Sequence, residues 1–138
     1  MRRAIVLLLV MLFLLQAAGP SLADGAVTPS PGSAERKAIM NTLRTFLKEN
    51  LDVDAVFVVK WLKVRDGWAW VETDPQSPDG NSFYEPFLAL LEKSEGVWAI
   101  AEIPSLEEDS PPVDDAWFEG LLEDFPGLPR DVFPWEKK

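Results

Sequence analysis

Apolar residues near the start of the predicted domain recur with the period of an α-helix. They stand at positions i, i+4, i+7 and i+8, which is typical of one side of an amphipathic helix. Ser33 has the residue type of an N-cap, and Glu35 lies in the first turn, where the helix dipole favours negative charge. The pattern predicts a helix over residues 34–49 with an apolar side made of Ile39, Leu43, Phe46 and Leu47.

From Asp54 onward the apolar period changes to two, the period of a half-buried β-strand. Two such runs, at 54–64 and 68–72, are separated by a segment that contains Asp66-Gly67. This dipeptide is the strongest short sequence signal for a β-hairpin. We therefore expect the two runs to pair as antiparallel neighbours joined by a tight turn.

Two further strands are expected after a loop. Residues 74–82 contain two prolines and one glycine, which favour a loop. A third strand is predicted over 83–93, with a bulge or a sheet edge near Pro86, because proline cannot donate to a strand ladder. A fourth strand is predicted over 97–103, after a short turn that contains glycine. The fold class is thus α+β, with one N-terminal helix packed on a four-stranded antiparallel meander within residues 33–104.

The C-terminal extension, residues 105–138, is acidic and rich in proline. It contains a short helical pattern over 114–124, followed by a run in which aromatic residues stand among prolines. Aromatic side chains carry much apolar area that is stabilising only when buried. We therefore expect this tail to fold back onto the domain, with isolated disorder as the alternative for residues 105–113.

The N-terminus has the features of a cleavable signal peptide. A positively charged start precedes a run over 4–18 that is apolar except for Gln16, and Ser21 and Ala23 supply the small residues of a cleavage site. This pattern predicts a signal peptide over 1–23, a linker over 24–32 that is mobile, and a periplasmic or secreted product with no membrane anchor after cleavage. A retained anchor is the alternative, but the run is shorter than the roughly 20 apolar residues that span a bilayer.

Composition excludes several classes of function. The chain has no histidine and no cysteine, so it lacks the commonest general base, the thiol nucleophile and the usual zinc ligands. It also has no glycine-rich phosphate-binding motif, and no metal or cofactor is expected. Cleavage would remove two of the 13 basic residues and none of the 23 acidic residues, which leaves a formal charge of −12. Such a surface repels nucleic acid.

Carboxylates remain as possible acid–base groups. Glu72, Glu85 and Glu102 lie on or near predicted strands and are the candidates for a glycosidase-type pair. The alternative is that they lie on a solvated sheet face or rim.

Calcium binding by the loop that follows Glu72 is not favoured. Asp74, Asp79 and Asn81 offer oxygen ligands, but Pro78 and Asp79 occupy the fifth and sixth positions of an EF-hand count from Asp74. Asx turns explain these residues more simply.

Four tryptophans on the predicted strands form the most informative group. If all of them face the helix, they belong to the core. If some line an opening between helix and sheet, they form an apolar pocket with acids around its mouth, which suits a small apolar or cationic ligand. The candidate pocket residues are Trp61, Trp68, Trp70, Trp98, Glu72 and Glu102.

The segments at 35–47, 55–73, 88–103 and 125–134 together resemble a group of small exported bacterial proteins. These proteins share an ERKAIL-type helix, an FVV-x-x-L-x-V strand and a G-W-A turn, and the group has no assigned activity. The order of one helix and then a meander is also similar to the cystatin-like and NTF2-like α+β domains. The resemblance implies export and a fold, and it implies no reaction.

The sequence therefore favours a non-enzymatic exported accessory or binding domain, which engages a protein or a small-molecule ligand that the sequence does not identify. Two alternatives stay open. One is a small hydrolase or isomerase that depends on carboxylates. The other is a protein inhibitor or partner-binding module that uses hairpin tips or the aromatic tail.

Overall fold

The computed structural model describes residues 25–136. The predicted signal peptide and its cleavage site, within residues 1–23, lie outside this part of the chain. Among the described residues, no helix has both the length and the apolar character needed to cross a bilayer.

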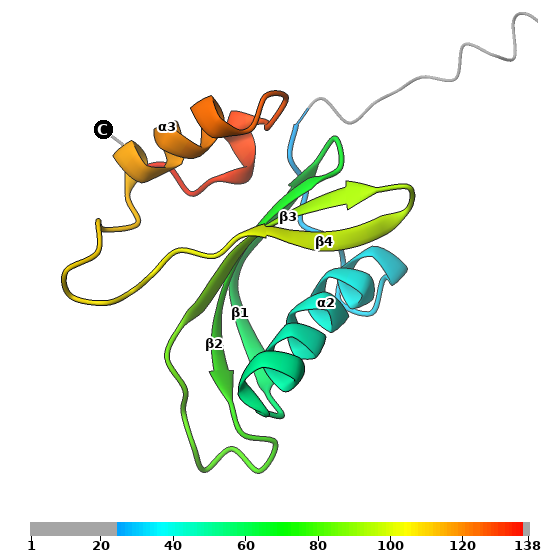
Figure 1. Cartoon of the computed structure of the whole chain (residues 1–138). Coiled ribbons are helices and arrows are strands. Elements are labelled where there is room, and N and C mark those ends of the chain that lie inside the picture. Colours follow the sequence, from blue (N-terminus) through cyan, green and yellow to red (C-terminus); the bar gives the residue numbers. More distant parts are fainter. Residues whose placement is uncertain (1–24, 137–138) are drawn as a thin grey trace, which may run out of the picture.

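The described chain forms an α+β fold in the predicted order (Figure 1). The sheet is a four-stranded antiparallel meander with strand order β1-β2-β3-β4. The elements are α2 (Ala34–Leu51), β1 (Val56–Arg65), β2 (Trp68–Gln76), β3 (Phe87–Ser94), β4 (Val97–Glu102), α3 (Asp115–Asp124) and a 3₁₀ turn, η1 (Arg130–Val132).

Helix α2 begins and ends through local capping. The Ser33 side chain accepts a hydrogen bond from the Arg36 backbone N–H at 3.2 Å, which confirms the predicted N-cap. The helix runs two residues beyond its predicted end, because the chain leaves it at Asp52, which has a left-handed backbone with φ of 50°. The backbone N–H of Asp52 donates to the Lys48 carbonyl at 3.1 Å, so the last turn stays closed.

The β1–β2 hairpin turns at the predicted dipeptide. Asp66 and Gly67 have φ of 51° and 79°, the two positive values that a type I′ turn requires. The Gly67 carbonyl accepts from the Lys93 backbone N–H at 2.7 Å, which ties the turn to β3. The hairpin prediction is confirmed.

Strand β2 is longer than predicted, and the loop expected over 74–82 begins only after Gln76. Proline fits inside this strand because Pro75 stands opposite Phe57 where no N–H is needed. The Pro75 carbonyl accepts from the Tyr84 backbone N–H at 3.0 Å, on the side away from β1. The loop prediction, which rested on proline content, was therefore wrong for residues 74–76.

Strand β3 starts later than predicted. The strand expected over 83–93 begins at Phe87, directly after Pro86. Before Pro86 there is only an isolated bridge between Phe83 and Gln76. The prediction of an irregularity near Pro86 thus agrees with the structure. The predicted strand, however, extended to both sides of Pro86, whereas β3 includes only residues after it.

The segment before α2 also differs from its prediction as a mobile linker over 24–32. Val27 and Val64 exchange backbone hydrogen bonds of 2.9 and 2.8 Å, and the Thr28 hydroxyl donates to the Leu62 carbonyl at 2.8 Å. The described part of this segment therefore forms a short antiparallel addition to the edge of β1. Such a contact depends on the neighbouring strand, so local composition did not indicate it.

Each face of the sheet buries its own apolar core, since successive strand residues point to opposite faces. Helix α2 covers the first face and the C-terminal region covers the second (Figure 1). The first core contains Ile39, Met40, Leu43, Leu62, Val64, Ala69, Val71, Ala89, Leu91 and Trp98. The second core contains Trp68, Trp70, Leu90, Phe118, Leu121, Leu128, Val132 and Phe133.

The C-terminal region folds back onto the sheet as predicted. It forms the third layer of the fold, after α2 and the sheet, and packs through aromatic side chains. The Trp70 ring lies 5.5 Å from the Phe118 ring and 5.4 Å from the Phe133 ring, measured between centroids. Phe118 and Phe133 stack at 4.6 Å. The Trp61 indole N–H donates to the Val132 carbonyl at 2.8 Å, so η1 is fixed to the sheet.

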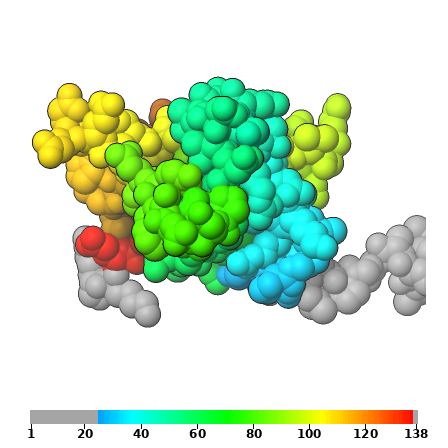
Figure 2. Space-filling view, turned by 90° about the horizontal axis from the view of Figure 1, so that it is seen from below, coloured from blue at the N-terminus to red at the C-terminus, as the bar shows by residue number. Residues whose placement is uncertain are grey.

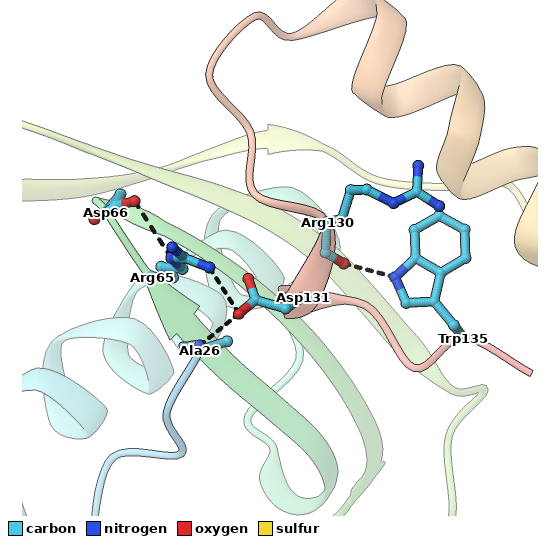
Figure 3. A network of polar contacts seen from close by, with 6 residues as sticks. All are labelled: Ala26, Arg65, Asp66, Arg130, Asp131 and Trp135. Carbon is cyan, nitrogen blue, oxygen red and sulfur yellow. Dashed lines mark hydrogen bonds and ion pairs between the residues drawn. The ribbon is translucent and has the colours of Figure 1, made fainter. Parts of the chain in front are cut away.

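A polar network joins the two ends of the described chain (Figure 3). The Asp131 carboxylate accepts from the Ala26 backbone N–H at 2.8 Å and from the Arg65 guanidinium at 2.9 Å. Beside it, the Trp135 indole N–H donates to the Arg130 carbonyl at 2.6 Å, and the Arg130 guanidinium lies 4.4 Å from the centre of that indole ring. The network closes the domain around the tip of the β1–β2 hairpin.

Candidate functional site

The structure divides the predicted pocket tryptophans between the two faces of the sheet. Trp61, Trp68 and Trp70 pack in or against the core beneath the C-terminal region, whereas Trp98 lies in the core beneath α2. A pocket lined jointly by all four is therefore not formed. The shared face of Trp68 and Trp70 follows from strand alternation, but the element that covers them is the C-terminal region instead of the N-terminal helix.

Two of these tryptophans, Trp70 and Trp98, are buried and contribute to the stability of the two cores. Trp70 has no exposed surface, and its indole N–H donates to the Glu72 carboxylate at 2.9 Å. The Trp98 indole nitrogen is buried and has no hydrogen-bond partner within residues 25–136. Trp98 is nevertheless held by apolar packing in the first core.

The candidate acid–base groups do not converge. Leu90 pairs with Trp70 on one side and with Glu102 on the other, and Glu72 lies two residues further along β2. From the strand spacing and rise, the Cα atoms of Glu72 and Glu102 are roughly 12 Å apart. Glu85 lies in the exposed segment before β3. This arrangement does not favour the paired carboxyl groups of a glycosidase, and it argues for other roles of these side chains.

The loop after β2 is organised by Asx-turn hydrogen bonds, as the sequence indicated. The Asp79 carboxylate accepts from the Ser77 hydroxyl at 2.6 Å and from the Asn81 backbone N–H at 3.0 Å. These two bonds lower the pKa of Asp79 below its ordinary value. Within residues 25–136, no three acidic side chains come close enough to share a metal ion.

The second face of the sheet carries a cleft of about 440 Å³ beside α3, which we call the α3 cleft. It lies between the end of β4, the loop that leads to α3, and one side of that helix. A volume of this size falls within the range of ligand pockets. Its lining residues are Glu102, Pro111, Pro112, Asp114, Ala116, Trp117, Gly120, Leu121 and Asp124.

The lining of the α3 cleft combines aromatic and negative groups. Trp117 is half-buried and rests against Trp70, with 5.6 Å between the ring centroids. Three carboxylates line the cleft, and within residues 25–136 no lysine or arginine does. The Asp114 carboxylate also caps α3 by accepting from the Trp117 backbone N–H at 3.1 Å. Carboxylates beside an indole favour a cationic group, both by charge and by cation–π contact.

Gly120 leaves the floor of the cleft open. It lies inside α3, where glycine costs about 1 kcal/mol of helix stability relative to alanine. A Cβ atom placed on Gly120 would meet no other atom within 4 Å. Packing therefore does not require glycine at this position, and its absent side chain leaves the space between Trp117 and Asp124 free.

Sequence reasoning identified one residue of the α3 cleft, Glu102. It placed Trp117 in a helical pattern without a role in a site. A usable signal was present, because Gly120 interrupts the helical pattern at one turn from Trp117 and Asp124. The part contributed by Pro111 and Pro112 depends on the path of the loop, which the local sequence does not determine.

A second hollow lies at the C-terminal end of α2, where exposed apolar residues gather. Figure 2 views the molecule from that side, with the loop after β2 beside the last turns of α2. Phe83 is 79% exposed and Leu51 is 64% exposed. A groove of about 280 Å³ there is lined by Leu47, Leu51, Val53, Pro75, Tyr84, Glu85, Pro86 and Phe87.

The chain was compared with models of protein families, with curated proteins and with solved structures. None of the three comparisons finds a match, so the fold and the α3 cleft are the grounds on which a function has to be argued.

Proposed function

We propose that the protein is an exported, non-enzymatic binding domain that holds a cationic group in the α3 cleft. The group is a lysine or arginine side chain of a partner protein, or a small organic amine. The observation that carries the proposal is the combination of an indole face, three carboxylates and an unfilled glycine position in one cleft. The carboxylates favour positive charge, the indole face favours a cation with apolar groups, and the glycine position leaves room for it.

The acidic surface supports the same type of ligand. The full chain has a formal charge of −10 at pH 7. A field of this sign raises the local concentration of cations and speeds their association, an effect that salt weakens. Binding to the cleft should therefore weaken as ionic strength rises.

A titration with a matched pair of small probes tests the proposal. N-acetyl-lysine methylamide carries the cation, and N-acetyl-norleucine methylamide has a neutral side chain without the ammonium group. We expect the lysine probe to shift the indole N–H resonance of Trp117 in a two-dimensional NMR spectrum and the norleucine probe to leave it unchanged. Equal shifts with both probes, or none with either, would contradict a cation site.

Variants of the lining separate the cleft from the surrounding acidic surface. Gly120→Leu directs a side chain into the cleft and should abolish binding without loss of folding, since its Cβ atom meets no other atom within 4 Å. Glu102→Gln and Asp124→Asn should each weaken binding several-fold. Glu123→Gln is the matched control, because Glu123 is exposed on the same helix and does not line the cleft. Equal weakening by the control would assign the effect to general charge.

Export is tested separately. Expressed with its own N-terminus in a Gram-negative host, the protein should accumulate in the periplasm and begin at Asp24. A protein recovered from the cytoplasm with its first residues intact would contradict the exported part of the proposal and leave the cleft untouched.

A further inference from the structure

We infer that the open half of the β1 edge binds an extended acidic segment of a partner protein as an added β-strand. This surface lies on the first strand of the sheet and is separate from the α3 cleft. Strand addition at this edge does not depend on whether the cleft binds a cation.

The edge of β1 already accepts one extended segment of the same chain. Val27 makes two backbone hydrogen bonds with Val64, and Thr28 reaches the Leu62 carbonyl. This addition covers only the half of β1 next to the hairpin turn. Within residues 25–136, β1 has no other strand partner besides β2.

The register identifies which backbone groups the other half leaves open. Phe57 stands opposite Pro75, which has no N–H and whose carbonyl bonds to Tyr84. Phe57 therefore cannot exchange hydrogen bonds with β2, and its N–H and C=O point to the outer edge. Antiparallel pairs alternate between bonded and non-bonded, so Val59, two residues on and opposite Thr73, also points outward.

The side chains of this half present an apolar surface beside those groups. Val56 and Val58 are each 43% exposed, whereas Phe57 and Val59 pack against the first core. An added strand would therefore find β-branched neighbours on its outer face and a firmly packed backbone. Both features favour strand addition.

One hollow at this edge carries the opposite charge to the protein as a whole. It has a volume of about 360 Å³, lies where the internal addition ends, and is lined by Arg36, Lys60 and Lys63, together with Thr28, Val59, Trp61 and Leu62. Among residues 25–136 no acidic residue lines it, although the Lys60 ammonium lies 3.7 Å from the Asp74 carboxylate, which an incoming carboxylate would have to share or displace. In a chain with formal charge −10, three cations around one hollow favour a carboxylate on the incoming strand.

The same features disfavour a second copy of this chain as the occupant. A β-bulge interrupts β1 between Val59 and Trp61, and the extra residue, Lys60, has a side chain that is 61% exposed. Bulges and edge lysines are common devices against pairing between identical edges. Two copies would also bring their net negative charges together.

The test uses the full mature protein and four peptides. The first is a seven-residue peptide of alternating valine and glutamate. The second replaces glutamate with lysine, and the third and fourth carry N-methyl groups on alternate residues of the glutamate peptide, one in each of the two possible frames. We expect the glutamate peptide to bind, with amide shifts in the NMR spectrum centred on Phe57 and Val59. The lysine peptide should bind at least tenfold more weakly, and N-methylation in one of the two possible frames should abolish binding.

Two variants separate edge binding from general attraction. The double variant Lys60→Glu, Lys63→Glu should bind the glutamate peptide at least tenfold more weakly. It should remain folded, because both changes are on the surface. Lys37→Glu is the control, since Lys37 is exposed on α2 and does not line the hollow. Equal binding of the glutamate and lysine peptides, or indifference to both N-methyl frames, would overturn the inference. So would a dimer in sedimentation velocity whose formation protects the amides of Phe57 and Val59.

Discussion

Replacing Phe118 with alanine tests whether the C-terminal region is a structural layer of the domain. Phe118 comes from α3 and is only 3% exposed. Its ring stacks on Phe133 at 4.6 Å and meets the edges of Trp70 at 5.5 Å and of Trp135 at 5.7 Å. The substitution removes a ring from the centre of the second core while leaving every element in place.

The expected loss of stability follows from burial. A buried Phe→Ala change costs about 3–5 kcal/mol, from lost transfer free energy and from the cavity that remains. Aromatic pairs add about 0.5–1.5 kcal/mol beyond buried area, and Phe118 takes part in several. Because a small domain has about 5–15 kcal/mol in total, we expect Phe118→Ala to lose about 4 kcal/mol, a large part of the whole.

Urea unfolding followed by tryptophan fluorescence measures this loss. The control is Leu106→Ala, because Leu106 is 45% exposed in the loop before α3 and should change stability by less than about 0.5 kcal/mol. A loss below about 1 kcal/mol for Phe118→Ala, with a single cooperative transition, would refute the view that this region completes the core.

Three further predictions concern the closure of the domain. Desolvation favours the neutral form of Asp131, but bonds from Ala26 and Arg65 outweigh it and lower the pKa of Asp131 below its ordinary value. The native protein should therefore be more stable than Asp131→Asn by about 1 kcal/mol or less for this exposed pair. This advantage should be full above the ordinary pKa of an aspartate and vanish as pH falls through the folded pKa; a constant difference in melting temperature across that range would contradict it. Gly67→Val should lose about 1–3 kcal/mol, because a β-branched residue resists a φ of 79°, and an unchanged melting temperature would mean that the turn tolerates it. A chain that begins at Pro29 should lose about 1–3 kcal/mol in urea unfolding, from the three hydrogen bonds of Val27 and Thr28 and the bond from Ala26 to Asp131, whereas no loss would restore the prediction of a mobile linker.

Local signals were sufficient for most of the fold. The cap at Ser33, the apolar side of α2 and the Asp66-Gly67 turn each depend on neighbours within a few residues, so the sequence predicted them correctly. Strand ends depended on partners. Pro75 fits in β2 because it stands opposite Phe57 where β1 needs no N–H, while its carbonyl accepts from Tyr84; proline content by itself does not contain that information.

The candidate site was less predictable than the fold. Alternation along β2 placed Trp68 and Trp70 on one face, but it did not tell which layer covers that face. Trp98 falls on the opposite face because β4 pairs with β3 in a register that puts Trp98 and Ile100 toward α2. The α3 cleft depends on where the loop after β4 returns, which is a property of the tertiary structure.

Hydrogen exchange of two indole N–H groups tests most directly whether the C-terminal region is part of one cooperative domain. The Trp61 indole is bonded to Val132, and the Trp70 indole is buried beneath α3. Measured against urea concentration, both should exchange with the same free energy as the slowest backbone amides of β2, because only global unfolding releases them. Exchange of both indoles at a clearly lower free energy, while the β2 amides stay protected, would mean that the C-terminal region detaches by itself and would contradict the account.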